Sequence, residues 1–390
     1  MDIASHGKKH FARTILAQGE EISSRLDTLR IQKFPPNAQK TLRAFSLAEV
    51  SHFIGVSQSY IKKLHLEGKG GVEPQTSSTG RRSYTAEQMH ALQDYLERSP
   101  RRQPGEPLKI ISVVNFKGGS GKTTTAAHLA QHLALTGHRT LAVDLDPQAS
   151  LSALHGIQPE LDRNLSYYDS LRYDDERRPL VDVIRKTNFP LLDIVPANLE
   201  LQEYEYDTPL AIQQAPAAGR TFYTRIGETL AQVEDRYDIV VIDCPPQLGY
   251  LTLTALTAST SVLITVHPQM LDIMSMSQFL LMLGGILTTI EEAGVKVELD
   301  WFSYLVTRFE PTDIPQTQMV GFMQSMFAEQ MLKHSMVKST AISDAGLTKQ
   351  TLYEVDRASF TRSTYDRAWE ALELVNSEIT SLVHRSWGRS

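Results

Sequence analysis

A short run rich in glycine, lysine and threonine contains the residue types best suited to binding phosphate. Residues 117–124 read Lys-Gly-Gly-Ser-Gly-Lys-Thr-Thr and lie between a strand-like run, Ile110–Asn115, and a helix-like stretch, Thr123–Leu135. Glycines let backbone N–H groups turn inward around an anion, and a helix N-terminus adds a positive dipole end. Lys122 is placed to reach the β- and γ-phosphates of a nucleotide, and the Thr123 hydroxyl to ligate Mg²⁺. The run therefore predicts a phosphate-binding loop.

Two aspartates follow apolar runs further along the chain. Asp146 comes just after Thr140–Asp144 and 24 residues after Lys122, and Asp243 ends the apolar run Ile239–Ile242. An aspartate at a strand end is often only a helix cap or a loop residue. Three motifs in order, each at the carboxyl end of a strand, favour a ligand site instead, because ligands bind at that edge of an open α/β sheet.

The loop resembles the deviant Walker A motif of the ParA/MinD ATPases. Its extra lysine, Lys117, precedes the glycine pair, and Phe116 stands where the usual phosphate loop opens with glycine. In that family the extra lysine crosses a nucleotide-sandwich dimer and contacts the phosphates bound by the other subunit. The resemblance implies this role for Lys117, ATP or ADP with Mg²⁺ as ligands, and a homodimer. A cation delivered in trans would stabilise charge on the transferred phosphoryl group.

The two aspartates match the same family. Leu141–Gln148 resembles its second acidic motif, in which Asp146 would orient the attacking water. Tyr237–Pro246 resembles a Walker B strand, in which Asp243 would hold Mg²⁺ together with Thr123. The resemblance implies that Lys117, Lys122 and Asp146 are catalytic. The nucleotide contacts that it implies are Lys117, Gly118, Gly119, Ser120, Gly121, Lys122, Thr123, Thr124, Thr307 and Arg308.

Three later segments extend the resemblance. Val262–Gln269 resembles the next strand of the family and its loop, and Leu305–Phe309 stands where its adenine-side loop would be, which is why Thr307 and Arg308 are assigned to the base. Lys338–Ala345 resembles a late segment associated with nonspecific DNA contact, with Lys338 as the contact. For Lys338 a plain surface charge is the other interpretation.

Short β-rich runs alternate with longer amphipathic stretches from Leu108 onward. Near-continuous apolar strands joined by helices indicate a mainly parallel sheet covered on both faces, so we expect an α/β P-loop NTPase fold. The expected strands are Ile110–Asn115, Thr140–Asp144, Leu191–Val195, Ile239–Ile242, Ser261–Val266 and Phe302–Val306. Expected helices include Thr123–Leu135, Phe222–Val233 and Met274–Thr288.

Composition excludes several classes of protein. The 390 residues are 41% hydrophobic and 22% charged, which is long and apolar enough for two or three folded domains. A single cysteine excludes an intramolecular disulfide framework and suits a reducing cytosol. No uninterrupted apolar run reaches about 18 residues, and the first residues lack a signal-peptide core, so we expect neither a membrane span nor secretion.

The net charge of −6 is the sum of two unequal parts. Residues 1–108 hold 16 lysines and arginines against 11 acidic residues, whereas the remainder holds 23 against 34. The boundary falls in residues 99–107, whose three prolines, glycine and charges are typical of a linker. We therefore expect a basic region, 41–98, joined through the linker 99–107 to an acidic ATPase domain, 108–390.

The basic region has the pattern of a winged helix-turn-helix. Ser46 and Glu49 form a capping box before a helix that stops at Gly55, and Ser57 caps a second helix, Gln58–Leu66. A glycine- and serine-rich stretch and a third capped helix follow, as in MerR-like proteins, while a structural hairpin is the alternative. A reading helix presents its first residues to base edges and nearby basic residues to phosphates. The candidate DNA contacts are Gln58, Ser59, Tyr60, Lys62, Lys63, Arg81 and Arg82.

The first forty residues contain one narrow apolar stripe. Phe11, Ile15, Ile22, Leu26 and Leu29 recur at helical spacing that is close to a heptad repeat. Such a helix either packs on its own domain or forms a dimer, and Gly19 weakens it in both cases by about 1 kcal/mol.

Two relatives of the phosphate loop are excluded. Nitrogenase iron proteins need several cysteines, and MinD-like proteins end in a basic membrane helix, whereas Tyr365–Val383 is acidic. The remaining resemblance is to large plasmid partition ATPases of the ParA type, above all the RepA group of RepABC cassettes. It implies a cytoplasmic, nucleoid-associated protein without a membrane role that partners a ParB-type (RepB-like) centromere-binding protein, nonspecific DNA and operator DNA. A nucleotide-responsive repressor with incidental ATPase activity is the alternative.

Overall fold

The computed structural model describes residues 11–33, 40–78, 80–115, 117–157, 165–214, 222–292, 294 and 296–389. Two compact units divide the chain, Met1–Thr41 and Leu42–Ser390. The first contains helix α1 (Phe11–Lys33), on which Phe11, Ile15 and Ile22 are exposed. The predicted stripe therefore lies on a helix, and its described apolar side chains are not buried within their own unit. The side chains of Leu26 and Leu29 are outside the described set.

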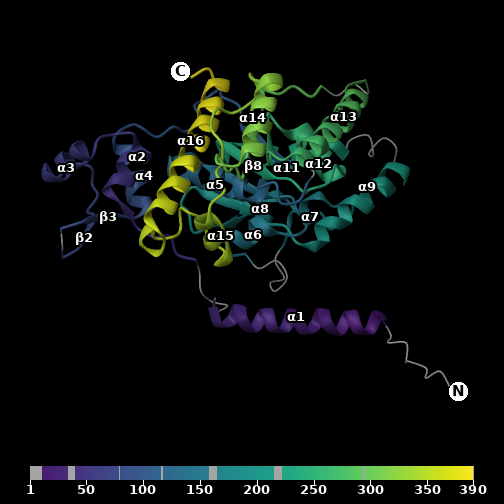
Figure 1. Cartoon of the computed structure of the whole chain (residues 1–390), viewed down its shortest axis with the longest axis horizontal. Helices are drawn as coiled ribbons and strands as arrows, with labels where there is room; N and C mark the ends of the chain where they lie inside the picture. Colours follow the sequence, from purple (N-terminus) through teal and green to yellow (C-terminus); the bar gives the residue numbers. More distant parts are fainter. Residues whose placement is uncertain are drawn as a thin grey trace. The chain divides into compact units, whose positions relative to one another are not determined.

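A seven-stranded sheet forms the centre of the larger unit (Figure 1). Its order is β10-β9-β4-β8-β5-β7-β6, and every pairing is parallel except that of β6 with β7. The predicted strands are confirmed within a residue or so, and the two-residue edge strand β6 was not foreseen. The strands are β4 (Lys109–Val114), β5 (Thr140–Asp144), β6 (Arg185–Lys186), β7 (Leu192–Val195), β8 (Ile239–Asp243), β9 (Ser261–Val266) and β10 (Trp301–Val306).

Both faces of this sheet are buried, because alternate residues of the strands other than β6 enter different cores. On β4, Ile111 and Val113 join one apolar cluster, while Ile110 and Val114 join the other. The first face packs against α5 (Lys122–Leu135), α15 (Thr340–Leu347) and α16 (Arg362–Ser386). The second packs against α7 (Tyr167–Leu171), α8 (Leu180–Val183), α11 (Arg225–Ala231), α12 (Tyr250–Ala258), α13 (Met270–Glu292) and α14 (Ile314–Phe327).

Shorter helices complete the connections: α6 (Ser150–Leu154), η1 (Leu199–Gln202), α9 (Glu203–Gln214), η2 (Phe222–Thr224), η3 (Glu234–Arg236) and η4 (Arg357–Ser359). Helix α13 passes a length and composition test for crossing a membrane, with a mean hydropathy of 1.7. Four of its apolar side chains, Ile273, Met276, Phe279 and Leu283, are nevertheless buried in the second core. It therefore serves as a covering helix of the sheet.

Residues 42–98, called the N-terminal region below, contain the predicted pair of helices. The elements are β1 (Phe45–Ser46), α2 (Leu47–Ile54), α3 (Gln58–Leu66), β2 (Gln75–Thr76), β3 (Arg82–Tyr84) and α4 (Ala86–Tyr95). Both expected capping boxes are present, Ser46 with Glu49 and Thr85 with Gln88, and Gly55 ends α2 in the left-handed conformation. The local sequence thus sets each helix boundary.

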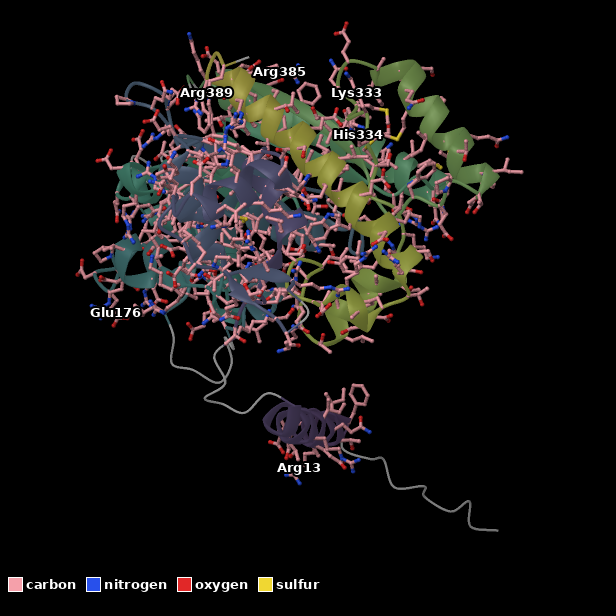
Figure 2. The ribbon with its side chains drawn as sticks, turned by 90° about the vertical axis from the view of Figure 1, so that its left-hand side faces the viewer. Arg13, Glu176, Lys333, His334, Arg385 and Arg389 are labelled. Atoms are coloured by element: carbon pink, nitrogen blue, oxygen red, sulfur yellow. The ribbon has the colours of Figure 1, made fainter. Side chains whose placement is uncertain are left out.

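The N-terminal region is not a separately folded unit beside the sheet. Phe45, Phe53 and Met89 belong to the same apolar cluster as Leu129 of α5 and Leu372 of α16. The predicted linker is also held in place: Arg389 donates to the carbonyls of Pro100 and Arg101, at 2.8 Å each, and Trp387 donates to that of Pro107. Figure 2 shows α16 with Arg385 and Arg389 at its C-terminal end.

Candidate nucleotide site

The phosphate loop connects β4 to α5 at the carboxyl edge of the sheet. Gly119 and Gly121 have φ angles of +79° and +85°, which only glycine adopts without strain, and so the loop can close around a small anion. Lys122 begins α5 and is only 6% exposed. Burial lowers the pKa of Lys122, while the nearby Asp243 and Asp146 oppose that shift. The loop thus holds a desolvated cation at the start of a helix.

Side chains from neighbouring strands brace the loop. Asn115 donates to the carbonyl of Thr265 on β9 and accepts from the backbone N–H of Lys117, at 2.9 Å. Thr307, directly after β10, donates to the carbonyl of Ser120 at 2.7 Å, and Arg308 donates to that of Gly119 at 3.0 Å. The Arg308 backbone is left-handed (φ +53°), a costly conformation for a non-glycine residue that the surrounding bonds must maintain. The two predicted base-side residues therefore contact the loop itself.

Two buried carboxylates stand side by side next to the loop. Asp144 of β5 is paired in register with Asp243 of β8. Asp144 accepts bonds from the Ser152 N–H and hydroxyl, at 2.7 Å each, and burial raises its pKa to about 7. Asp243 differs, because both of its carboxylate oxygens are buried without a hydrogen-bond partner among the described residues. Burial first, and then Asp144, raises the pKa of Asp243 well above its usual value.

An oxygen-liganded cation fits this arrangement. Mg²⁺ is commonly held by one or two protein oxygens together with substrate phosphates and waters. Thr123 lies close enough to Asp243 to lower its pKa, which places a hydroxyl next to the carboxylate on the same side of the loop. Among the described residues no three His, Cys, Asp or Glu side chains gather as a complete metal site. The residues present therefore suit a cation that arrives with a phosphate.

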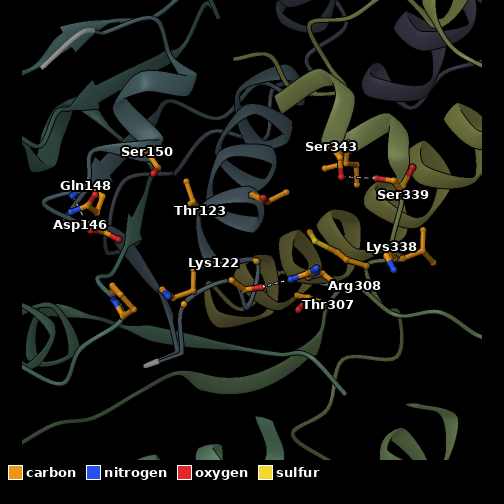
Figure 3. Close-up of a pocket in the computed structure, with 18 residues that line it drawn as sticks. Lys122, Thr123, Asp146, Gln148, Ser150, Thr307, Arg308, Lys338, Ser339 and Ser343 are labelled. Carbon is orange, nitrogen blue, oxygen red and sulfur yellow. Dashed lines mark hydrogen bonds between the residues drawn. The ribbon is translucent and has the colours of Figure 1, made fainter. Parts of the chain in front are cut away.

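A cavity of about 470 Å³ opens above the loop (Figure 3). Asp146 and Gln148 line one side, and residues 336–339 with Ile342 and Ser343 line the other. The second wall is tied to the segment after β10, since Phe309 donates to the Met336 carbonyl and accepts from the Lys338 N–H. The residues that line the whole cavity are Gly118, Gly119, Gly121, Lys122, Thr123, Thr124, Asp146, Gln148, Ser150, Pro246, Thr307, Arg308, Met336, Val337, Lys338, Ser339, Ile342 and Ser343.

Lys338 lies in that cavity wall and not on a separate surface. Its ammonium forms an ion pair with Glu310 at 2.8 Å, and its side chain is 55% exposed. The position suits contact with a bound nucleotide as well as the DNA contact that the sequence suggests. DNA contact by Lys338 therefore stays a prediction.

The Lys117 side chain forms an ion pair that the sequence did not predict. Its ammonium lies 2.9 Å from a carboxylate oxygen of Asp272, which is on α13 and is 6% exposed. The Lys117 side chain is itself 42% exposed. The extra lysine is thus held within its own chain, beside the cavity, in this structure.

Apart from Lys338, the predicted DNA contacts lie in the N-terminal region, away from this cavity's lining. Gln58, Ser59, Tyr60, Lys62 and Lys63 are all exposed on α3, whereas Ile61 and Leu64 between them are buried. Of the two arginines after the glycine-rich stretch, Arg81 is exposed and Arg82 is partly buried. The structure therefore brings together the loop residues, Asp146, Asp243, Thr307 and Arg308, and leaves these seven side chains to a second surface.

Several residues of the cavity and its supports escaped the sequence analysis. Asn115 adjoins the loop in sequence but belongs to no motif recognised there, and Asp272 is brought to the loop only by the position of α13. Asp144 could have been found, because it is a charged residue inside an apolar strand two positions before Asp146. The contribution of residues 336–343 to the cavity could not have been found, because these residues are more than 200 positions from the loop in sequence.

Comparisons with known proteins agree with this geometry. A family profile described as an AAA domain matches residues 108–294. A protein of Sinorhizobium fredii named "Putative replication protein A" is 66% identical over 99% of this chain and 97% of its own. Protein SopA of Escherichia coli is 27% identical over 88% of this chain and 89% of its own.

Solved structures show the same architecture. One described as "Partition Protein" superposes with a TM-score of 0.62 over 96% of this chain and 99% of its own, at 19% identity. Cobyrinic acid a,c-diamide synthase from Mycobacterium smegmatis, solved with bound ADP and magnesium, gives a TM-score of 0.51 over 62% and 91%, at 26% identity. The chain belongs to the ParA-type partition ATPases, within the RepA-like group of that P-loop family.

Proposed function

We propose that the protein is an ATP-hydrolysing partition motor that binds Mg·ATP in the loop cavity and dimerises around it. The observation that carries the proposal is Asp243, a buried carboxylate whose two oxygens have no hydrogen-bond partner among the described residues. Leaving a buried charge unpaired costs several kcal/mol unless a ligand compensates it. Thr123 and Asp243 would hold Mg²⁺, which when bound neutralises charge on the nucleotide phosphates.

Different residues of the site would bind the phosphates, activate water and couple ATP binding to dimerisation. Gly118–Thr124 would cradle the phosphates, with the Lys122 ammonium against the β- and γ-groups. Asp146 is partly exposed at the cavity wall, where its carboxylate can orient a water for attack on the γ-phosphate. Lys117 would leave Asp272 and reach the phosphates of a second subunit. Dimerisation would thereby depend on ATP.

The exposed α3 side chains and the capped helix pair support a DNA-reading role for the N-terminal region. The protein would bind operator DNA there and repress its own operon, and bind nonspecific DNA as an ATP dimer. A ParB-type partner would stimulate hydrolysis and release the subunits from the nucleoid. Hydrolysis coupled to release makes directed movement of DNA possible, in the cytoplasm and along the nucleoid.

The deciding experiment is steady-state ATP turnover by the full chain with four additions: none, nonspecific duplex DNA, a cognate ParB-type protein, and both together. A partition motor should turn over slowly alone and fastest with both. Turnover that stays the same in all four conditions contradicts the motor.

Asp146→Ala separates the motor from a nucleotide-responsive repressor. The variant should bind ATP and operator DNA but lose hydrolysis and plasmid inheritance. Normal inheritance with retained operator binding would leave repression as the function. Lys117→Ala adds a second check: it should bind nucleotide yet form no ATP-dependent dimer by light scattering, and dimers that persist contradict its role in trans.

A further inference from the structure

A second cavity, outside the nucleotide site, lies between the N-terminal region and the start of α16. Its volume is about 880 Å³, and we call it the arginine groove. Five arginines line it, from three separate stretches of chain. The full lining is Arg43, Ala44, Ser46, Ala48, Glu49, Arg81, Arg82, Ser83, Asp356, Arg357, Ala358, Phe360, Arg362, Tyr365, Asp366 and Trp369.

The acidic residues of the groove are already committed to partners within the chain. Glu49 accepts from Arg43 at 2.6 Å and from the Ser46 N–H at 2.8 Å, as part of the capping box. Asp366 pairs with two nitrogens of Arg357, one at 2.6 Å. Asp356 accepts from the N–H of Ala358 at the start of η4. Three carboxylates therefore neutralise two arginines and cap two helices.

The other three arginines are held less closely, and Arg362 acts on Asp366 only at longer range. Arg81, Arg82 and Arg362 form no ion pair within the described part of the chain. One terminal nitrogen of Arg82, Nη1, is buried without a hydrogen-bond partner there. Two of these arginines come from β3 and its approach, and the third is the first residue of α16. The groove thus gathers three guanidinium groups that form no ion pair among the described residues, and such groups suit the forked geometry of phosphate oxygens.

The groove shares two arginines with the predicted DNA-contact residues of the N-terminal region. Arg81 and Arg82 are at once groove residues and the arginines expected to contact DNA after the glycine-rich stretch. Five guanidiniums against three carboxylates give the lining an excess of positive charge, in a unit whose overall charge is acidic. Arg81 and Arg82 thus share one cavity with Arg357 of η4 and Arg362 of α16, which are parts of the ATPase domain.

We propose that the arginine groove binds backbone phosphates of duplex DNA, so that Arg362 of the ATPase domain extends the footprint of the N-terminal region. The proposal rests on operator binding by that region. Phosphate contacts fix position and strengthen binding without reading sequence. The groove would thus fix the position of the ATPase domain on the DNA that α3 binds.

The test compares Arg362→Ala with Arg385→Ala in the full chain. Arg385 is an exposed arginine near the other end of α16, about 35 Å away along the helix, and does not line the groove. Binding is followed by fluorescence anisotropy on a 30-base-pair duplex taken from upstream of the chain's own gene and on a scrambled duplex, from 50 to 200 mM salt. Removing one phosphate contact lowers the slope of log affinity against log salt by about 1. Between those salt concentrations, wild-type affinity should therefore fall about threefold more than that of Arg362→Ala.

The expected result is a reduced slope on both duplexes for Arg362→Ala, restoration by Arg362→Lys, and an unchanged slope for Arg385→Ala. ATP turnover without DNA should be the same in all variants, because Arg362 is outside the nucleotide cavity. An Arg362→Ala slope equal to that of the wild type overturns the groove proposal.

Two further arms keep the outcomes distinct. Lys62→Ala with Lys63→Ala tests α3: if that pair weakens DNA binding and Arg362→Ala does not, only the groove proposal fails. If neither changes binding, DNA recognition by the N-terminal region fails as well. A fluorescent polyglutamate peptide provides the alternative occupant, and weakened peptide binding with unchanged DNA binding by Arg362→Ala would show that the groove takes an acidic protein and overturn the proposal.

Discussion

The phosphate-loop region and the junction between α2, α5 and α16 each bury a carboxylate, but in opposite states. Asp243 has no partner for either oxygen among the described residues. Glu373 of α16 accepts from Tyr353 at 2.5 Å and contacts His52 of α2 at 2.5 Å and His132 of α5 at 3.3 Å. Unsatisfied buried charge is tolerated where a ligand completes it, whereas satisfied charge holds elements together. Asp243 therefore marks a ligand site, whereas Glu373 with His52, His132 and Tyr353 connects elements of the fold and is called the joint below.

Replacing the carboxylate of the joint should have the largest effect. Glu373→Gln keeps the size of the side chain but leaves His52, His132 and Tyr353 with a single neutral acceptor. Breaking a buried charged network costs about 3 kcal/mol of unfolding free energy. Urea unfolding measures this loss of unfolding free energy. The control is Glu370→Gln, because Glu370 is exposed and lies one turn earlier on α16. A loss below about 1 kcal/mol would remove the distinction between the two regions.

Removing the cation of the site should cost function and not stability. Lys122→Ala deletes charge-assisted hydrogen bonds to phosphate, and we expect about a 100-fold loss of ATP affinity by calorimetry. Because Lys122 is a desolvated cation, the nucleotide-free variant should unfold at the same temperature as the wild type or higher. A lower melting temperature with unchanged affinity would mean that Lys122 is structural.

The two carboxylates should respond to neutralisation with opposite signs. Asp243→Asn relieves a buried, unpartnered charge, so the nucleotide-free protein should gain about 1 kcal/mol of unfolding free energy while Mg²⁺-dependent ATP binding is lost. Thermal unfolding without nucleotide and nucleotide titration with and without Mg²⁺ measure the two effects. Destabilisation equal to that of Glu373→Gln would place Asp243 among the structural residues.

A smaller, pH-dependent effect is expected at His52. Its hydrogen bond to Glu373 raises its pKa above the usual value of 6.5, although burial opposes the shift. A raised histidine pKa gives stability that is fully present below pH 6.5 and lost as the pH rises through the folded-state pKa. The wild type should therefore exceed His52→Gln most at pH 5.5 and least at pH 9. In a Glu373→Gln background this pH dependence should vanish, and its persistence there would assign it to another group.

The sequence predicts the cavity far better than the joint, for a physical reason. Residues 117–124 form a contiguous motif, and the strands around it are apolar runs whose ends place Asp146 and Asp243 at one edge. Glu373 reaches His52 across 321 positions and His132 across 241, and no local pattern encodes such contacts. The same limit explains the unforeseen Lys117–Asp272 pair and the packing of residues 99–107 against α16.

The composition of α5 has a mechanical consequence for both regions. The helix has 14 residues with neither glycine nor proline, so it behaves as a straight rod about 21 Å long. Lys122 occupies its first position, in the cavity, and its last carbonyls accept hydrogen bonds from His90 and Gln93 of α4. No hinge separates the phosphate end from the N-terminal region, so a tilt of about 5° at one end would displace the other by about 2 Å.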